Sequence, residues 1–108
     1  MLLLPLKQVS YGTFGFKIIV DGATVGKIYC DIIDNTFIIN YIIISEKYRG
    51  QGYAKKSIKL LMKKYKHYKY FETTTIRKTN MASRNLFKSL GFKEIKHNKQ
   101  IYAIYKNK

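Results

Sequence analysis

The sequence predicts one mixed α/β domain, built on a mostly antiparallel sheet with a single parallel strand–helix–strand crossover and two helices. Three observations lead to this fold class. The first half of the chain holds three strand patterns that are separated by tight-turn signals. The apolar period then lengthens to that of a helix, and from there strand and helix patterns alternate. A length of 108 residues suits one domain, so we expect residues 1–108 to form a single unit.

Three strands are expected in the first half, over Phe14–Val20, residues 24–33 and residues 36–45, because β-branched and aromatic residues dominate them. The Asp-Gly pair at 21–22 is a hairpin signal, since glycine adopts the positive φ that tight hairpins require. The Asp-Asn pair at 34–35 marks a second turn. The third strand is almost wholly apolar, which predicts that both of its faces are buried.

A helix is expected after Gly52, where apolar residues begin to recur at helical spacing. The residues of this apolar stripe are Ala54, Ile58, Leu61, Met62 and Tyr65. Lysines fill the rest of the helix surface, at Lys55, Lys56, Lys59, Lys63, Lys64 and Lys66. The pattern predicts an amphipathic helix whose apolar side packs on the sheet.

The remaining elements follow in a regular order. A short strand is expected over residues 69–76, and a second helix begins after Asn80, a residue type that caps helix N-termini. Gly91 ends that helix as a residue after the C-cap would. The last two strands are expected at residues 92–95 and 100–105. The predicted order is therefore β-β-β-α-β-α-β-β, with a right-handed crossover around the first helix.

The charge of the chain is strongly positive and uneven. The formal net charge is +15, and residues 47–108 hold 18 Lys and Arg against two acidic residues, whereas residues 1–46 hold three Lys against four. This asymmetry predicts attraction of a polyanionic cofactor, a nucleic acid or both. The alternative is compositional: Lys, Ile and Tyr are all abundant, as a very AT-rich gene would produce, and lysines on helices are ordinarily just solvated.

Several classes are disfavoured by single features. Cys30 is the only cysteine, so no disulfide forms within the chain, and its apolar neighbours predict a place in the core. His67 and His97 lack metal-ligand spacing, so we expect no metal. The apolar start has no basic leader, and the longest apolar block, residues 37–44, is too short to cross a bilayer. We therefore expect a soluble cytoplasmic protein without a membrane partner.

The stretch from residue 42 to residue 54 carries the clearest chemical signal. An apolar strand runs into a loop that contains Gly50 and Gly52, and then into the helix. Small residues let a ligand approach the backbone, while the first N–H groups of a helix lack partners and lie at the positive end of its dipole. Arg49 adds a positive charge. The loop therefore predicts a main-chain site for a phosphate or pyrophosphate.

Two motifs that follow one another along the chain resemble those of the GNAT N-acetyltransferase superfamily. The motif Arg49-x-x-Gly52-x-Ala54, preceded by Tyr48 and an apolar strand, looks like the family's acyl-CoA pyrophosphate loop. The motif Asn80-x-x-Ser83-x-x-Leu86-Phe87-x-x-x-Gly91-Phe92 is similar to the family's Asn-x-x-Ala-x-x-Leu-Tyr-x-x-x-Gly-Phe. Their separation is usual for the family, and the hairpin at residues 21–26 resembles the one that commonly precedes them. The resemblance spans residues 13–106.

The resemblance implies a GNAT-like fold that transfers an acetyl group from acetyl-CoA to an amine, by direct attack of the amine on the thioester. The strands at residues 42–44 and 70–76 would splay apart, and the pantetheine arm of coenzyme A would enter between them. Backbone groups near Ile42 and Ile44 would bond to this arm. The residues that would hold the pyrophosphate through their N–H groups are Arg49, Gly50, Gln51, Gly52, Tyr53 and Ala54.

The same resemblance places further residues at the cofactor. Asn80 and Ser83 would lie along the pantetheine, and Lys55 or Arg84 would reach the outer phosphate. Phe87 is also expected to contact the cofactor. At the position of Phe87 the family often has a tyrosine that protonates the leaving thiolate, and phenylalanine cannot do so. The reaction should then be slower, with another tyrosine or water serving as the acid, or the protein binds CoA without turnover.

The acceptor side is less defined. Only about a dozen residues precede the meander, whereas family members usually have a strand and two helices there, so we expect a truncated N-terminus and an open acceptor face. An open face suits a protein amine or another macromolecule, or a homodimer partner completes the pocket. Glu72 and Tyr41 are the catalytic candidates, the first as general base, with solvated or core roles as the alternatives. The rival functions are a nucleic-acid or ribosome-binding module and a non-catalytic CoA-binding regulator.

Overall fold

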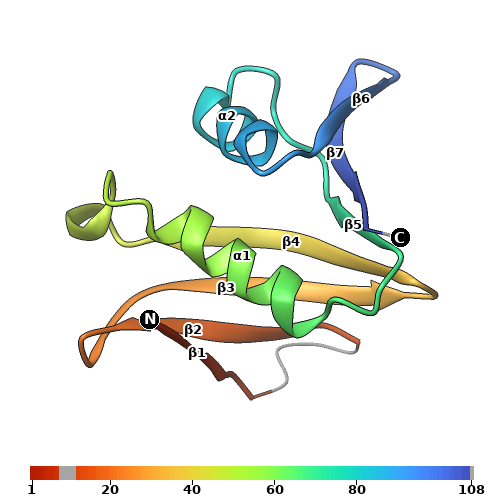
Figure 1. Cartoon of the computed structure of the whole chain (residues 1–108). Coiled ribbons are helices and arrows are strands. Elements are labelled where there is room, and N and C mark those ends of the chain that lie inside the picture. Colours follow the sequence, from red (N-terminus) through yellow and green to blue (C-terminus); the bar gives the residue numbers. More distant parts are fainter. Residues whose placement is uncertain (8–11, 108) are drawn as a thin grey trace.

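The computed structural model describes residues 1–7 and 12–107, and within them seven strands form one mixed sheet in the order β1-β2-β3-β4-β5-β7-β6 (Figure 1). The strands are β1 (Leu2–Pro5), β2 (Phe14–Val20), β3 (Ala23–Ile33), β4 (Thr36–Ile44), β5 (Tyr70–Thr73), β6 (Lys93–His97) and β7 (Gln100–Lys106). The helices are α1 (Tyr53–Lys64) and α2 (Met81–Ser89), with a short 3-10 helix η1 at Glu46–Tyr48. The mixed α/β class and the two helices are as expected from the sequence.

The order of elements matches the prediction except at the N-terminus, where β1 was not expected. This strand pairs antiparallel with β2, from Leu2 opposite Ile19 to Pro5 opposite Phe16. Four residues carry too short a pattern to be read as a strand, and the proline at its end is a residue that sheets tolerate at edges. In the structure Leu3 packs against the core, and the pairing with β2 provides the partner that local propensity cannot reveal.

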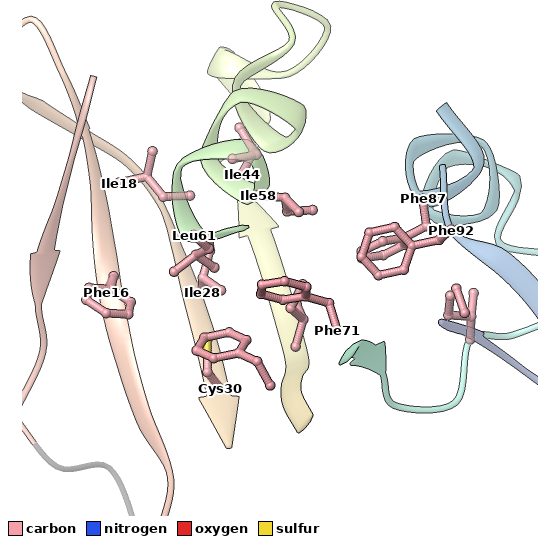
Figure 2. Packing of buried hydrophobic residues seen from close by; sticks show 14 of the residues in the cluster. Phe16, Ile18, Ile28, Cys30, Ile44, Ile58, Leu61, Phe71, Phe87 and Phe92 are labelled. Atoms are coloured by element: carbon pink, nitrogen blue, oxygen red, sulfur yellow. The ribbon is translucent and has the colours of Figure 1, made fainter. Parts of the chain in front are cut away.

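Both helices pack on the same face of the sheet. Phe37 of β4 and Phe71 of β5 are register partners and are fully buried, and they share one core cluster with Ile58 of α1 and Phe87 of α2. Figure 2 shows side chains of this cluster converging from strands and helices that are distant in sequence. The sheet passes from the antiparallel meander to the C-terminal strands through the single parallel pair β4–β5, and α1 is its crossover, as predicted.

Cys30 lies in this core, as the apolar context of its sequence predicted. Its side chain is fully buried, and burial raises the pKa of its thiol to about 12, with a smaller contribution from the charge of Asp31. The thiol therefore stays protonated at neutral pH and packs as a small apolar group rather than reacting.

The opposite face of the sheet carries no helix in the described residues, and this corrects one expectation. The strand at residues 36–45 was predicted to be buried on both faces, yet in β4 burial alternates along the strand. Tyr41 and Ile43 are 52% and 39% exposed because their face is uncovered. The apolar run gave no sign of this, since an apolar side chain on an uncovered face looks the same in sequence as one in the core.

Candidate active site

The centre of the site is a β-bulge in β4 that separates this strand from β5. Tyr29 of β3 pairs with Tyr41, but the next residue, Cys30, pairs with Ile39, so Asn40 is left out of register. The parallel pairing of β4 with β5 ends at the same point, where Ile39 lies opposite Thr73. A bulge bends its strand and increases the local twist. Beyond it β4 continues to Ile44 without β5, so the two strands diverge (Figure 1).

The divergence confirms the expected splay but moves its origin. The strand predicted over residues 69–76 ends at Thr73, and only Ile76 makes a further isolated bridge, to Ile101. The hydroxyl of Thr74 donates to the carbonyl oxygen of Asn40 at 2.8 Å. The backbone N–H of Thr74 also donates to the carbonyl oxygen of Ile39 at 3.3 Å, so Thr74 links the two strands twice at the point where they begin to part.

A cleft of about 550 Å³ opens along the free part of β4, between the N-terminal ends of α1 and α2. Ten of the twelve residues predicted to contact the cofactor line it: Ile42, Ile44, Arg49, Gly50, Gly52, Tyr53, Ala54, Lys55, Asn80 and Ser83. Residues from the strand, the loop and both helices thus meet around one space, although they are up to 41 positions apart in the sequence. The other two predicted residues, Gln51 and Phe87, lie outside this cleft.

One end of the cleft is a cradle of unpaired backbone N–H groups at the start of α1. Gly50 and Gly52 have φ values of 79° and 77°, which place them in the left-handed region that glycine adopts without strain. The first helical hydrogen bond of α1 is donated by the backbone N–H of Lys56 to the carbonyl oxygen of Gly52, at 3.1 Å. Among the described residues no side chain caps this end, so the N–H groups of residues 53–55 stay available.

Arg49 has a structural role in addition to its charge. Its Nε donates to the carbonyl oxygen of Ile44 at 2.8 Å, and its own backbone N–H donates to the carbonyl oxygen of Glu46 at 3.2 Å. These bonds close the loop over η1 and hold it against the end of β4. The backbone N–H of Arg49 is therefore already engaged, which leaves the cradle to the residues that follow it.

The cradle lies in a region of uncompensated positive charge. Residues 47–71 hold nine Lys and Arg and no acidic residue. Both ion pairs found among the described residues are made by Glu94, with Arg84 and Lys88, outside this stretch. The dipole of α1 adds partial positive charge at the same point. An anion in the cradle would thus meet favourable potential from main chain and side chains together.

A second cleft of about 250 Å³ continues from the first toward the bulge. The two share Ile42, Asn80 and Ser83, so they form one groove with a wide end at the cradle and a narrow end at the splay. Tyr41 and Phe87 line the narrow end. Phe87 is only 4% exposed, and its ring packs on Phe92 at 5.1 Å between centroids.

Asn80 and Ser83 sit at the junction because α2 begins there. The side-chain oxygen of Asn80 accepts a hydrogen bond from the backbone N–H of Ser83 at 3.1 Å, so the expected helix cap is confirmed. Gly91 follows the helix with a φ of 89°, also as expected.

Arg84 is not available to an outer phosphate in this structure. Its guanidinium donates to Glu94 through Nε and Nη2, at 2.8 and 3.0 Å, and to the carbonyl oxygen of Lys78 through Nη1 at 2.8 Å. The hydrogen bonds from Arg84 hold the pKa of Glu94 down at about 2. This pair ties α2 to β6, and of the two cations considered from the sequence only Lys55 lines the cleft.

The catalytic candidates lie in different places. Tyr41 lines the narrow end of the groove, whereas Glu72 lines neither cleft. Glu72 sits on β5 between Ile38 of β4 and Ile104 of β7, on the face that the helices leave uncovered. Gln51 accepts a hydrogen bond from the hydroxyl of Tyr53 at 3.0 Å and projects outside the groove.

Sequence reasoning missed the residues that create the splay. Asn40 is the bulge residue, Thr74 holds the strands at the point of divergence, and both line the narrow end of the groove. Asn40 also donates to the carboxylate of Asp31, which accepts a second bond from Thr13 at 3.0 Å. The one available signal was a polar residue in the middle of an otherwise apolar strand.

The described residues contain no group of three His, Cys, Asp or Glu side chains placed to hold a metal ion. Neither described helix is long and apolar enough to cross a membrane.

A sheet split beside such a cradle is the geometry expected of an acyl-CoA-dependent N-acyltransferase. A family model described as the acetyltransferase (GNAT) family matches residues 5–92, which is most of the chain, and the chain belongs to this family. No curated protein sequence matches the chain at a significant level. The resemblance seen in the two sequence motifs is thus confirmed.

Solved structures share the fold at low sequence identity. An acetyltransferase from Bacillus subtilis in complex with CoA has a TM-score of 0.76 and 13% identity, over 89% of this chain and 78% of its own. The ribosomal-protein-S18-alanine N-acetyltransferase from Escherichia coli has a TM-score of 0.72 and 16% identity, over 88% and 68%. A GNAT family acetyltransferase from Elizabethkingia anophelis with acetyl-CoA bound has a TM-score of 0.70 and 17% identity, over 89% and 77%.

Proposed function

We propose that the protein transfers an acetyl group from acetyl-CoA to an amine, with the cosubstrate bound along the groove between β4 and α2. The observation that carries the proposal is the cradle of unpaired N–H groups at the wide end of a groove that leads to the splay. A pyrophosphate needs such donors, and a thioester at the end of a long arm needs a separate, narrower place to react. The bound CoA and acetyl-CoA of the structural neighbours support this assignment.

The pyrophosphate would accept hydrogen bonds from the N–H groups at the start of α1, with Lys55 near the outer phosphate. The pantetheine arm would run past Ile42, Asn80 and Ser83, which border both parts of the groove. Beyond the bulge, β4 no longer pairs with β5, so its backbone groups on that side can bond to the arm as they would to a strand. The acetyl group would then lie at the narrow end.

The reaction would be a direct transfer. The neutral amine attacks the thioester carbonyl, a C–N bond forms, the C–S bond breaks, and CoA leaves as a thiolate that takes up a proton. Phe87 lines this part of the groove and has no proton to give. Tyr41 carries a hydroxyl at the narrow end, and we assign it the proton for the thiolate, with water as the alternative donor.

We place the acceptor amine on the uncovered face of the sheet. This face exposes Tyr41 and Ile43 and carries Glu72 on the strand next to the splay, and it gives a large acceptor room to approach. A protein amine therefore suits it better than an enclosed small molecule. One structural neighbour is by its title a transferase for an alanine of a ribosomal protein. Glu72 stays our candidate base, and homodimerisation and a cytoplasmic location stay predictions.

Calorimetric titration with acetyl-CoA tests the first half of the proposal, after a check that no CoA has co-purified. We expect near-stoichiometric binding, followed by thiol release when the protein is incubated with amines and basic peptides. A folded, ligand-free sample that binds no acetyl-CoA would overturn the function. Binding without thiol release from any acceptor would favour the rival reading, a CoA-binding regulator.

A further inference from the structure

The exposed side of α1 carries a row of lysines, which we call the lysine ridge: Lys56, Lys59, Lys63 and, in the turn that follows the helix, Lys66. The spacing of three and four residues puts Lys56, Lys59 and Lys63 on one side of the helix, opposite the buried Ser57, Ile58 and Leu61, and Lys66 follows in the next turn. All four are exposed, and none lines the groove. The ridge is thus a surface separate from the cofactor cradle.

The positive charge of the ridge lowers the stability of the helix that carries it. Like charges three and four residues apart on a helix repel each other, and Lys55 and Lys56 stand in the first turn, where the dipole disfavours cations. No acidic residue occurs from residue 47 to residue 71, and the ion pairs of the described residues are elsewhere. A polyanion bound along the ridge would remove this repulsion.

We propose that the lysine ridge binds the phosphate backbone of a nucleic-acid duplex, without reading its sequence. The helical part of the ridge, from Lys56 to Lys63, spans about 10 Å, since seven residues rise at about 1.5 Å each. Over that length a duplex presents about six phosphate charges, at about one per 1.7 Å. The ridge side chains are all lysine, with no Arg, Asn or Gln in the row to form paired bonds with base edges.

Other anionic partners fit the ridge less well. A helix that lies on a membrane inserts an apolar face, whereas the apolar side of α1 is buried on the sheet and its exposed side offers only Leu60, at 36% exposure. A single strand would need aromatic side chains on which bases can stack. The tyrosines next to the ridge, Tyr65 and Tyr68, are packed against the core instead.

The test uses fluorescence anisotropy with a labelled 20-bp DNA duplex of mixed sequence. Four phosphate contacts predict a slope of log K against log salt of about −3.6. The ridge variant carries Lys59→Glu, Lys63→Glu and Lys66→Glu, and it should bind at least about 100-fold more weakly near 0.1 M salt, since each lost contact accounts for about eightfold. Its melting temperature should change little, because repulsion among the three glutamates replaces that among the lysines, while the glutamate at position 59 gains Lys55 and Lys56 as neighbours of opposite charge.

A matched control variant separates a built surface from overall charge. Lys93→Glu, Lys96→Glu and Lys106→Glu lower the net charge by the same amount on β6 and β7, at the other end of the sheet. We expect it to keep duplex affinity within a few-fold. Equal loss in both variants would overturn the proposal and make total charge the cause.

Two further outcomes would also overturn it. Displacement of the duplex by saturating CoA would place the nucleic acid in the cradle rather than on the ridge. Binding to vesicles of anionic phospholipid but not to the duplex would assign the ridge to a membrane surface. The duplex measurement is independent of acyl transfer, so it can succeed or fail whether or not the protein binds acetyl-CoA.

Discussion

The two ends of the groove are formed by different kinds of groups. The wide end is made by main chain: Gly50 and Gly52 turn the loop, and the next residues line the cleft at a helix start that no described side chain caps. The narrow end is made by side chains and by strand register, through the bulge at Asn40 and the bond from Thr74. In the proposed function, the first end would hold an anion and the second would position the reacting bond.

This difference bears on which changes each end tolerates. A backbone site is insensitive to most side-chain substitutions, but it fails when its glycines or its helix start are altered. A side-chain site can be tuned one group at a time. We therefore expect substitutions at the wide end to act on binding and those at the narrow end to act on rate.

The largest effect is expected at the wide end, from Gly52→Glu. The change puts a carboxylate beside the cradle and a side chain at a φ of 77°, so the affinity for acetyl-CoA measured by calorimetry should fall at least about 100-fold. Gly22→Glu is the matched control, because Gly22 has a φ of 80° and its position is open in the β2–β3 turn. An equal loss in both variants would attribute the effect to strain and charge rather than to the cradle.

The next effect is expected at the narrow end, from Phe87→Tyr. A phenol there would supply the proton that phenylalanine cannot, so kcat for thiol release should rise by about tenfold, below the usual range for an optimised general acid. The Kd for acetyl-CoA should stay unchanged. Phe92→Tyr adds the same hydroxyl to the ring that packs on Phe87 but outside the groove, and it should leave kcat as it is. If Phe87→Tyr leaves kcat unchanged, proton supply to the thiolate does not limit the rate.

The same contrast explains what the sequence could reveal. The cradle was predictable because its signal is local: two glycines, a strand before them and a helix after them, within residues 42–54. Most of the residues expected at the cofactor do line the groove for the same reason, since strand and helix periods fix which way each one points.

The narrow end was not predictable in this way. The bulge depends on how β4 pairs with β3, and β1 depends on β2, and such pairings are not visible in one strand alone. Arg84 was one of two candidates for the outer phosphate, because nothing in its own segment reveals that Glu94 would engage it from ten residues away. The exposure of Tyr41 likewise depends on tertiary structure, because no described helix covers its face of the sheet.

A smaller effect is expected where the strands part, from Thr74→Val. The change removes the hydrogen bond to the carbonyl of Asn40, which should lower stability by about 0.5–1 kcal/mol in urea unfolding. It should also lower kcat a few-fold without changing the Kd for acetyl-CoA. Thr75→Val is the control, as Thr75 lines the same end of the groove and makes no side-chain hydrogen bond among those the structure describes. Identical stability and kcat in the two variants would show that this hydrogen bond affects neither quantity.

The smallest effect concerns the wall of the narrow end, where the Arg84–Glu94 pair ties α2 to β6. The pKa of Glu94 falls from 4.5 to about 2, first because Arg84 donates hydrogen bonds to its carboxylate. The folded state therefore binds this proton less readily than the unfolded state, and the stabilisation is fully present above pH 4.5 and is lost as the pH falls toward 2.

In Glu94→Gln this pH dependence of stability should vanish. Melting temperatures of wild type and Glu94→Gln should thus differ by a constant amount near neutral pH and converge between pH 4.5 and pH 2. Parallel curves down to pH 2 would show that the ionisation of Glu94 does not affect stability. A loss of acetyl-CoA binding at neutral pH in this variant would mean that α2, and not only the cradle, holds the cosubstrate.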